Sequence, residues 1–122
     1  MKIMKTKKYL SDIKYLKKKL NYVKINEDLN SILGAIQSGN SNSKAVTGLG
    51  KEYGGKVFKV RVPNSTAKKG KSNGFRLIYY LVTEQNTIYL ITIYSKKDAN
   101  KNPTNEQLKT WIEIGVNENE DI

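Results

Sequence analysis

The stretch KVFKVRV, residues 56–62, opens the part of the chain that decides the fold. It is followed by FRLIYYLV at residues 75–82 and by IYLITIY at residues 88–94. Each segment has the alternating or continuously apolar character of a β-strand, and the three follow one another at hairpin distance. The sequence therefore predicts an antiparallel sheet over about residues 56–95, with the second and third segments as its central strands.

The residues before the sheet show the three- and four-residue spacing of amphipathic helices. A first helix is expected to begin after Thr6 as its N-cap, with an apolar stripe formed by Tyr9, Leu10, Ile13, Leu16, Leu20 and Val23. A second helix is expected to begin at Asn26 and to end at Gly39. Together they predict a helical hairpin over about residues 6–39 that lies across one face of the sheet.

The remaining segments complete an α+β fold. Residues 1–5 are either an edge strand or a frayed end, and residues 39–55, rich in Gly, Ser and Asn, are expected to form a long loop. The capping-box pattern TNEQ predicts a short C-terminal helix over about residues 104–113. We therefore expect one domain over residues 1–122, with two N-terminal helices packed on a twisted antiparallel sheet of three to four strands.

The composition excludes several kinds of chemistry. The chain has no cysteine and no histidine, so it has no disulfide, no thiolate metal site and no imidazole to act as acid or base. Catalysis would have to use Lys, Arg, Tyr, carboxylates or hydroxyls, and we expect no metal and no other cofactor. No apolar run approaches the roughly 20 residues that span a bilayer, and the N-terminus lacks the apolar region of a secretory signal. We therefore expect a cytoplasmic protein with no membrane partner.

Positive charge is concentrated in the predicted sheet. The chain carries a net charge of +11, and residues 56–101 contain ten Lys or Arg against two acids. Such a charge is typical of a protein with an anionic partner, but it also occurs in any protein from a lysine-rich proteome. The clustering on one sheet, with Arg61 and Arg76 among the lysines, favours a polyanion as partner.

Strand periodicity assigns faces to the basic residues. Lys59 and Arg61 are expected on one face of their strand, opposite an apolar face. Arg76 lies at the start of a buried strand, where a charged side chain needs a partner, and acids are scarce nearby. We therefore expect a ligand phosphate to bind there. Tyr94 is expected on the face of Ile88, Leu90 and Thr92. The lysines of the loop after residue 62 suit either phosphate contact or an ordinary exposed turn.

Three segments, taken together and in order, resemble a known family. VFKVRVPNS at residues 57–65, KGKSNGFRLIYY at residues 69–80 and YLITIYSK at residues 89–96 resemble the RelE/ParE superfamily of toxins from bacterial type II toxin–antitoxin modules. The similarity is greatest to the HigB-like, RelE-type branch; it extends over the helical hairpin and the sheet and weakens beyond Asp98.

The resemblance implies a fold and an activity. The implied fold is compact, with two N-terminal helices against a twisted antiparallel sheet. The implied activity is ribosome-dependent cleavage of mRNA in the A site, without metal, by attack of the ribose 2′-OH on the adjacent phosphate. The products would be a cyclic phosphate and a free 5′-OH. The implied partners are the ribosome, mRNA and a cognate antitoxin that is acidic where it docks.

The resemblance also implies residue roles. The catalytic set would be Lys59, Arg61, Arg76, Tyr94 and Lys96, with the two arginines stabilising the phosphorane, Tyr94 stacking on or orienting a base, and a lysine assisting proton transfer. Further contacts with RNA or the ribosome would come from Lys68, Lys69, Lys71 and Lys97. RelE itself has an arginine after its last strand and a tyrosine further on, whereas this chain has lysines there and no tyrosine after Tyr94. The identity of the general acid and base therefore stays open.

Two other functions remain compatible with the sequence. ParE-like relatives bind and inhibit DNA gyrase and need no cluster of arginine and lysine around a phosphate. A non-catalytic basic protein that binds RNA or the ribosome would bind with a steep salt dependence but would cut no strand. The presence of Lys59, Arg61, Arg76 and Tyr94 together favours RNA cleavage.

Overall fold

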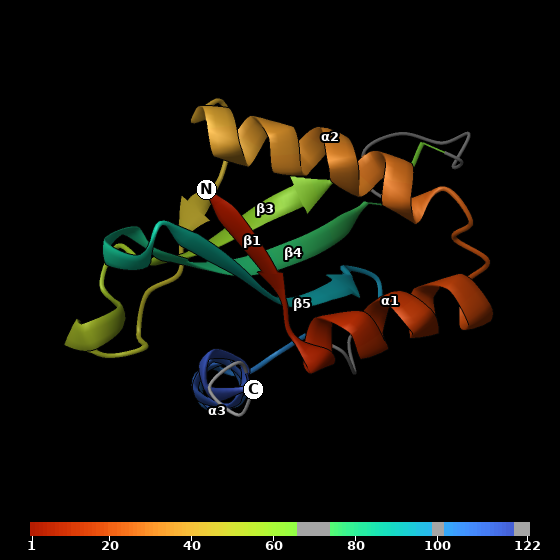
Figure 1. Cartoon of the computed structure of the whole chain (residues 1–122). Coiled ribbons are helices and arrows are strands. Elements are labelled where there is room, and N and C mark those ends of the chain that lie inside the picture. The colour runs from red at the N-terminus through yellow and green to blue at the C-terminus, as the bar shows by residue number, and fades with distance from the viewer. Residues whose placement is uncertain (66–73, 99–101, 119–122) are drawn as a thin grey trace.

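The computed structural model describes residues 1–65, 74–98 and 102–118, and within them it is an α+β fold of three α-helices and a five-stranded mixed sheet (Figure 1). The helices are α1 (Lys7–Lys19), α2 (Ile25–Ser38) and α3 (Asn105–Asn117). The strands are β1 (Lys2–Lys5), β2 (Lys44–Ala45), β3 (Val57–Val62), β4 (Phe75–Val82) and β5 (Thr87–Ser95). Two short 3₁₀ helices, η1 (Lys51–Tyr53) and η3 (Thr83–Gln85), precede β3 and β5.

The strand order is β1-β5-β4-β3-β2, and the antiparallel centre β3-β4-β5 agrees with the sequence prediction. The predicted number of strands and the purely antiparallel arrangement are wrong. β1 is an edge strand that runs parallel to β5. β2 lies inside the segment that was expected to be a loop, and it pairs with two residues of β3. β1 confirms the edge-strand alternative for residues 1–5. β2 was not predicted, because a strand of two residues is too short to show a period of two.

The helices begin and end close to where capping residues predict. The Thr6 hydroxyl accepts a hydrogen bond from the Tyr9 backbone N–H, and Gly39 ends α2 in the left-handed conformation with φ 77°. The predicted start at Asn26 is wrong: Lys24 is the N-cap of α2, without a side-chain hydrogen bond. The expected capping box at Thr104 is present, but α3 continues to Asn117.

The apolar stripe predicted for the first helix is too long. α1 ends at Lys19, so the predicted stripe residues Leu20 and Val23 lie after the helix and are 45% and 73% exposed. Tyr22, which the pattern did not select, is buried instead and stacks on the Phe75 ring. Within the described residues, none of the helices has the length and the apolar character that crossing a membrane requires.

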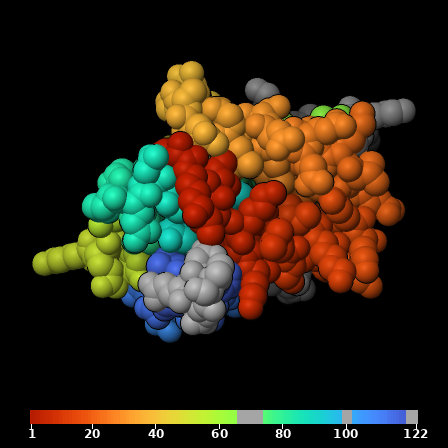
Figure 2. Space-filling view, viewed as in Figure 1, coloured from red at the N-terminus to blue at the C-terminus, as the bar shows by residue number. Residues whose placement is uncertain are grey.

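Both faces of the sheet are covered, by different helices. α1 packs along β5 and α2 along β3, and their apolar side chains join one face of the sheet in a single core. α3 covers part of the opposite face, where Leu108 and Ile112 pack with Ile78 and Ile91 (Figure 1). In the space-filling view, β1 (red) lies between α2 (orange) and the teal turn that leads into β5 (Figure 2), where the Lys2 backbone N–H donates to the Asn86 carbonyl.

A β-bulge in β5 changes which side chains share a face. Tyr79 of β4 pairs with Leu90, but Ile78 pairs with Thr92, so that Ile91 is skipped. A bulge of this kind breaks the strict alternation of side chains along a strand. The prediction that Tyr94 lies on the face of Leu90 is therefore wrong, because the skipped residue moves Tyr94 to the opposite face.

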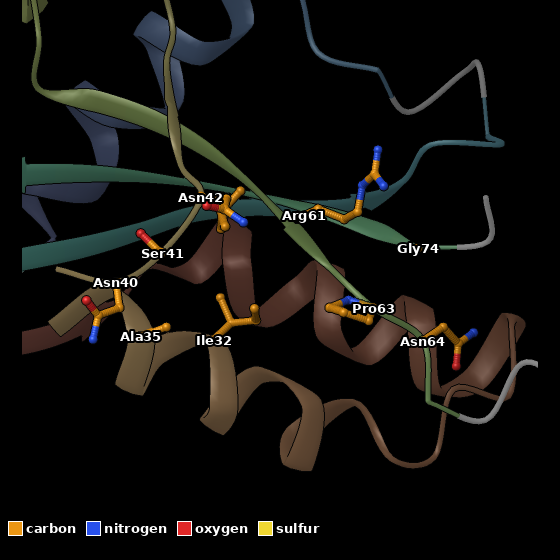
Figure 3. A pocket seen from close by; sticks show the side chains of 10 residues that line it. Ile32, Ala35, Asn40, Ser41, Asn42, Arg61, Pro63, Asn64 and Gly74 are labelled. Atoms are coloured by element: carbon orange, nitrogen blue, oxygen red, sulfur yellow. The ribbon is translucent and has the colours of Figure 1, made fainter. Parts of the chain in front are cut away.

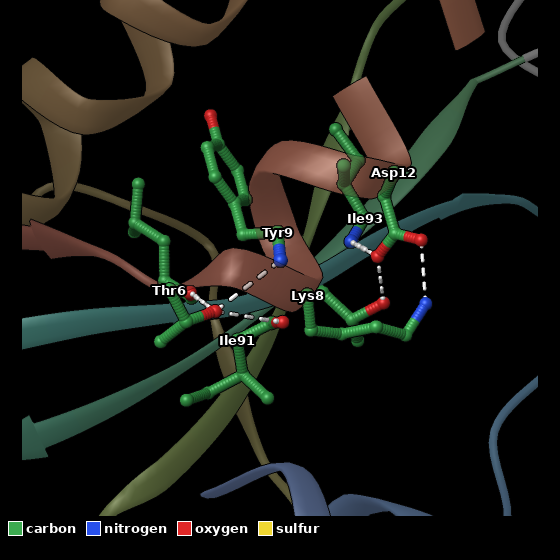
Figure 4. A network of polar contacts seen from close by, with 8 residues as sticks. Thr6, Lys8, Tyr9, Asp12, Ile91 and Ile93 are labelled. Atoms are coloured by element: carbon green, nitrogen blue, oxygen red, sulfur yellow. Dashed lines mark hydrogen bonds and ion pairs between the residues drawn. The ribbon is translucent and has the colours of Figure 1, made fainter. Parts of the chain in front are cut away.

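Polar groups of α1 and its N-cap satisfy the backbone around this bulge (Figure 4). The Thr6 hydroxyl donates to the Leu90 carbonyl at 2.7 Å. One carboxylate oxygen of Asp12 accepts from the Thr92 hydroxyl at 2.5 Å and from the Ile93 N–H at 3.3 Å. β1 pairs with β5 only as far as Leu90, so the backbone of β5 from there on bonds to the N-cap and the first turns of α1 instead.

The other carboxylate oxygen of Asp12 binds Lys8, whose Nζ lies 2.5 Å away. The same Nζ lies 4.4 Å from the centroid of the Trp111 ring on α3. This chain of contacts connects β5, α1 and α3, so Asp12 is central to the packing of three elements.

A second carboxylate secures the chain that leaves β3. Asp28 accepts hydrogen bonds from the Tyr22 hydroxyl at 2.6 Å and from the backbone N–H and hydroxyl of Ser65 at 3.1 and 3.0 Å. Burial raises the pKa of Asp28, but the hydrogen bonds from Tyr22 and Ser65 outweigh it and hold the pKa below its usual value.

Replacing Asp12 is expected to destabilise the protein. In Asp12→Ala the Thr92 hydroxyl and the Ile93 N–H lose their acceptor, which should lower the free energy of unfolding by about 1–3 kcal/mol in urea titrations. Ser11→Ala, at the exposed neighbouring position, is the control and should stay within about 0.5 kcal/mol of the parent. Equal urea midpoints for the two variants would contradict this account of the bulge.

The lowered pKa of Asp28 predicts a pH dependence. Because the folded state favours the ionised carboxylate, its contribution is full above the pKa of the unfolded chain and is lost as pH falls below about 4. Asp28→Asn should therefore flatten the fall of the urea midpoint between neutral and acid pH. Glu27→Gln, which removes the exposed carboxylate next to it, is the control. A fall as steep in Asp28→Asn as in Glu27→Gln would show that Asp28 contributes nothing.

Candidate functional site

Five basic side chains surround one hollow of about 470 Å³ at the end of the sheet where β3 and β5 finish and β4 begins. We call it the cationic hollow; its lining residues are Asn42, Lys44, Lys59, Arg61, Arg76 and Lys96. The two arginines and Lys59 lie on the sheet face opposite α2, because their strand neighbours on the other face form the core with α1 and α2. Among the described residues, no acidic side chain lines the hollow.

Sheet pairing places like charges directly opposite one another. Lys44 of β2 pairs with Lys59 of β3, and Arg61 of β3 pairs with Arg76 of β4. Like charges at directly opposed positions destabilise a sheet. In the described part of the chain none of these four side chains forms an ion pair. The fold therefore holds uncompensated positive charge at close range, which an anionic ligand would neutralise.

Arg76 is the least exposed cation of the hollow. It is half-buried, and its Nη1 donates to the Phe75 carbonyl at 3.3 Å. Burial lowers the pKa of Arg76, the charge of Arg61 lowers it further, and Tyr94 acts in the opposite direction. Both lowering effects penalise the guanidinium charge, and a phosphate bound beside it would relieve both.

Tyr94 lies next to Arg76 rather than in the hollow. It is the pairing partner of Arg76 across β4 and β5, but it is 8% exposed and packs in the core with Ile78 and Leu108. Burial raises the pKa of Tyr94, which the charge of Arg76 only partly opposes, so its hydroxyl stays protonated at neutral pH. A ring this buried has no open face for a base, so the geometry does not support the expected stacking role.

Gly74 lets the start of β4 approach the end of β3. A Cβ at this position would lie 3.1 Å from the Val62 carbonyl oxygen and 3.6 Å from Cγ of Arg61. The first distance is shorter than an ordinary van der Waals contact and the second is an ordinary one, so a residue with a Cβ would displace the Val62 carbonyl by a few tenths of an ångström. The glycine before Arg76 thus helps to keep the two arginines opposite each other.

The structure brings together four of the residues that the sequence selected as catalytic: Lys59, Arg61, Arg76 and Lys96. Lys97 is exposed but does not line the hollow. The three remaining expected RNA contacts lie outside the described residues; they are Lys68, Lys69 and Lys71. Sequence reasoning missed Asn42 and Lys44, since the segment around them was expected to be a loop. A longer β2 would have shown the alternation of a β-strand in the sequence, and that pattern would have indicated that Lys44 pairs with Lys59.

The lining of the hollow determines what it can bind. Ammonium and guanidinium groups carry only hydrogen-bond donors, which suits phosphate oxygens and does not suit a metal cation. In residues 1–65, 74–98 and 102–118, no three side chains of His, Cys, Asp or Glu lie close enough to hold a metal ion. The arrangement is suited to binding a phosphate and to stabilising negative charge that develops on it.

A scan against models of known protein families finds none that matches this chain. The assignment of the cationic hollow as the functional site therefore depends on the arrangement of its side chains, their burial and their charge.

Proposed function

We propose that the protein is a metal-independent endoribonuclease that cleaves mRNA in the ribosomal A site and acts as the toxin of a type II toxin–antitoxin module. The observation that carries the proposal is the cationic hollow, in which Lys59, Arg61, Arg76 and Lys96 lie around one space with no acidic side chain. The resemblance of the β3–β5 sequence to RelE/ParE toxins supplies the reaction.

The reaction is an in-line displacement at phosphorus. The 2′ oxygen of a ribose forms a bond to the adjacent phosphorus, and the bond from that phosphorus to the 5′ oxygen of the next nucleotide breaks. The 2′-OH loses its proton and the leaving oxygen gains one, so the products are a 2′,3′-cyclic phosphate and a 5′-OH. No water or metal ion enters the balanced step.

The protein contributes electrostatic stabilisation. The phosphorane carries more negative charge than the phosphodiester, so donors that already surround the phosphate stabilise the transition state more than the ground state. We assign this role to Arg61 and Arg76, whose repulsion is relieved as the negative charge grows. Tyr94 is a positioning residue: it packs beside Arg76 and limits the directions in which the guanidinium can point.

We assign proton transfer to the lysines of the cationic hollow. Lys59 and Lys96 both line it, and the chain has no histidine to serve instead. Lys44 adds a fifth cation beside Lys59, which suits a contact with a neighbouring phosphate of the strand.

The proposal includes the surroundings in which the protein acts. Its partners are the ribosome, mRNA and an antitoxin whose acidic segment covers the cationic hollow, and its location is the cytoplasm. Clustered cations of this kind bind RNA backbone with a strong dependence on salt, so association should weaken steeply as ionic strength rises.

Primer extension on one mRNA, incubated with purified protein in the presence and absence of translating ribosomes, tests the activity. We expect cuts within codons only when ribosomes are present. The absence of cuts in both reactions would reject the nuclease, and a supercoiling assay with DNA gyrase would then test the ParE-like alternative.

Arg76→Ala tests the site. Loss of one preorganised donor to the phosphorane should lower the rate of cleavage by about 10²–10³-fold. Lys14→Ala removes one positive charge from an exposed position of α1 and should cleave at the parental rate. Ribosome binding by Arg76→Ala, followed by sedimentation, should remain measurable, which separates loss of chemistry from loss of binding. Parental cleavage by Arg76→Ala would show that the cationic hollow is not the active site.

A further inference from the structure

A second hollow, of about 570 Å³, lies between α2 and the end of β3 (Figure 3). We call it the α2 hollow. Its lining includes the apolar side chains of Ile32, Ala35 and Val60 and the polar side chains of Asn40, Ser41 and Asn42. Its volume falls within the range of about 300–1,000 Å³ that is common for small-ligand sites.

The α2 hollow exists because β2 is short. Pairing between β2 and β3 ends at Lys59, so no strand of the described residues covers the outer edge of β3 from Val60 onwards. The chain between α2 and β2 contributes Asn40, Ser41 and Asn42 to the lining of the space above α2. The segment is held in place by a hydrogen bond between the hydroxyls of Ser41 and Ser43, at 2.8 Å, and by one from the Tyr79 hydroxyl to the Ser43 hydroxyl, at 2.7 Å.

The two hollows meet at the edge of β3. Arg61 and Asn42 line both of them. Figure 3 shows the Arg61 guanidinium pointing away from Ile32 and Ala35, while the base of its side chain borders the space above α2. A ligand bound to Arg61 in the cationic hollow can therefore extend around the strand edge into the α2 hollow without leaving the protein surface.

The chemistry of the two hollows differs. Of the residues that the structure describes, five cations line the first hollow, whereas Arg61 is the single charged residue that lines the second. In the described part of the chain, the side-chain amides of Asn40 and Asn42 have no hydrogen-bond partner. Each amide offers a donor and an acceptor, the combination that recognises the edges of nucleobases, and the apolar floor suits the flat face of a base.

We propose that the α2 hollow binds the base and sugar of the nucleotide next to the phosphate held in the cationic hollow, and that it selects which base is accepted there. This inference rests on the proposed function, because it requires an RNA phosphate in the cationic hollow. The phosphate binds among the cations of the cationic hollow, and the neutral base binds in the mostly uncharged α2 hollow. The side-chain amides of Asn40 and Asn42 then form hydrogen bonds with the edge of the base.

Filling the α2 hollow tests the inference. Ala35→Phe places a ring in the space from the α2 side, and Gln37→Phe places the same ring on the exposed side of the same helix as a control. The probes are fluorescein-labelled RNAs of five nucleotides, one for each base, and an abasic strand with the same number of phosphates. Affinity is followed by fluorescence anisotropy.

We expect the parent and Gln37→Phe to bind at least one of the base-containing strands about tenfold more tightly than the abasic strand. In Ala35→Phe this ratio should fall towards one. In Asn40→Ala the ratio should fall only for the preferred base, because one edge contact is lost while the floor remains.

The outcomes separate this inference from the proposed function. Equal affinity of the parent for the base-containing and abasic strands would overturn base selection and leave the cationic hollow as a phosphate site. Tenfold preference retained in Ala35→Phe would place base recognition elsewhere and would also overturn it. If the parent binds none of the strands, the inference fails, whereas the proposed cleavage is decided separately by primer extension with translating ribosomes.

Discussion

One skipped residue in β5 determines which side chains share a face with Arg76. Up to Leu90 the strand alternates in step with β4, and a regular strand would continue by placing Ile93 opposite Arg76. Because Ile91 has no pairing partner, Tyr94 takes that place and Ile93 enters the core beneath α1 and α2. Next to the bulge, Thr6 bonds to the Leu90 carbonyl, and Asp12 bonds to the Thr92 hydroxyl and the Ile93 N–H.

The cationic hollow depends on this support because its charges oppose one another. Two like-charged pairs lie across adjacent strands, and Arg76 is partly removed from water. A sheet with such pairs is less stable than one with neutral residues in their place. The apolar core on the other face, together with the carboxylates of Asp12 and Asp28, offsets that loss. Conflict of this kind between stability and local charge is common where a protein must bind a ligand of opposite charge.

Much of the fold could be predicted from the sequence, since strong local signals specify it. Thr6 and Gly39 mark helix ends through capping, and the alternation in β3 separates Val60 from Arg61. The face of Tyr94 could not be predicted, because a bulge leaves no trace in a strand that is apolar on both sides. β2 was missed because two residues show no periodicity. Four basic residues that the sequence selected line one hollow because they lie in the strands or directly after them, whereas Lys44 enters it through pairing with β3.

The contacts that hold the bulge also determine when in synthesis the site can form. The Thr6 hydroxyl and the Leu90 carbonyl are 84 positions apart, and Asp12 and Thr92 are 80 apart. β1 can pair only after β5 has been synthesised, and β5 follows all the other strands in the chain. Contacts over such distances form late and slowly compared with those within a helix. A nascent chain of this protein therefore carries the lysines of α1 and β3 before β5, and with it the assembled cationic hollow, has been made.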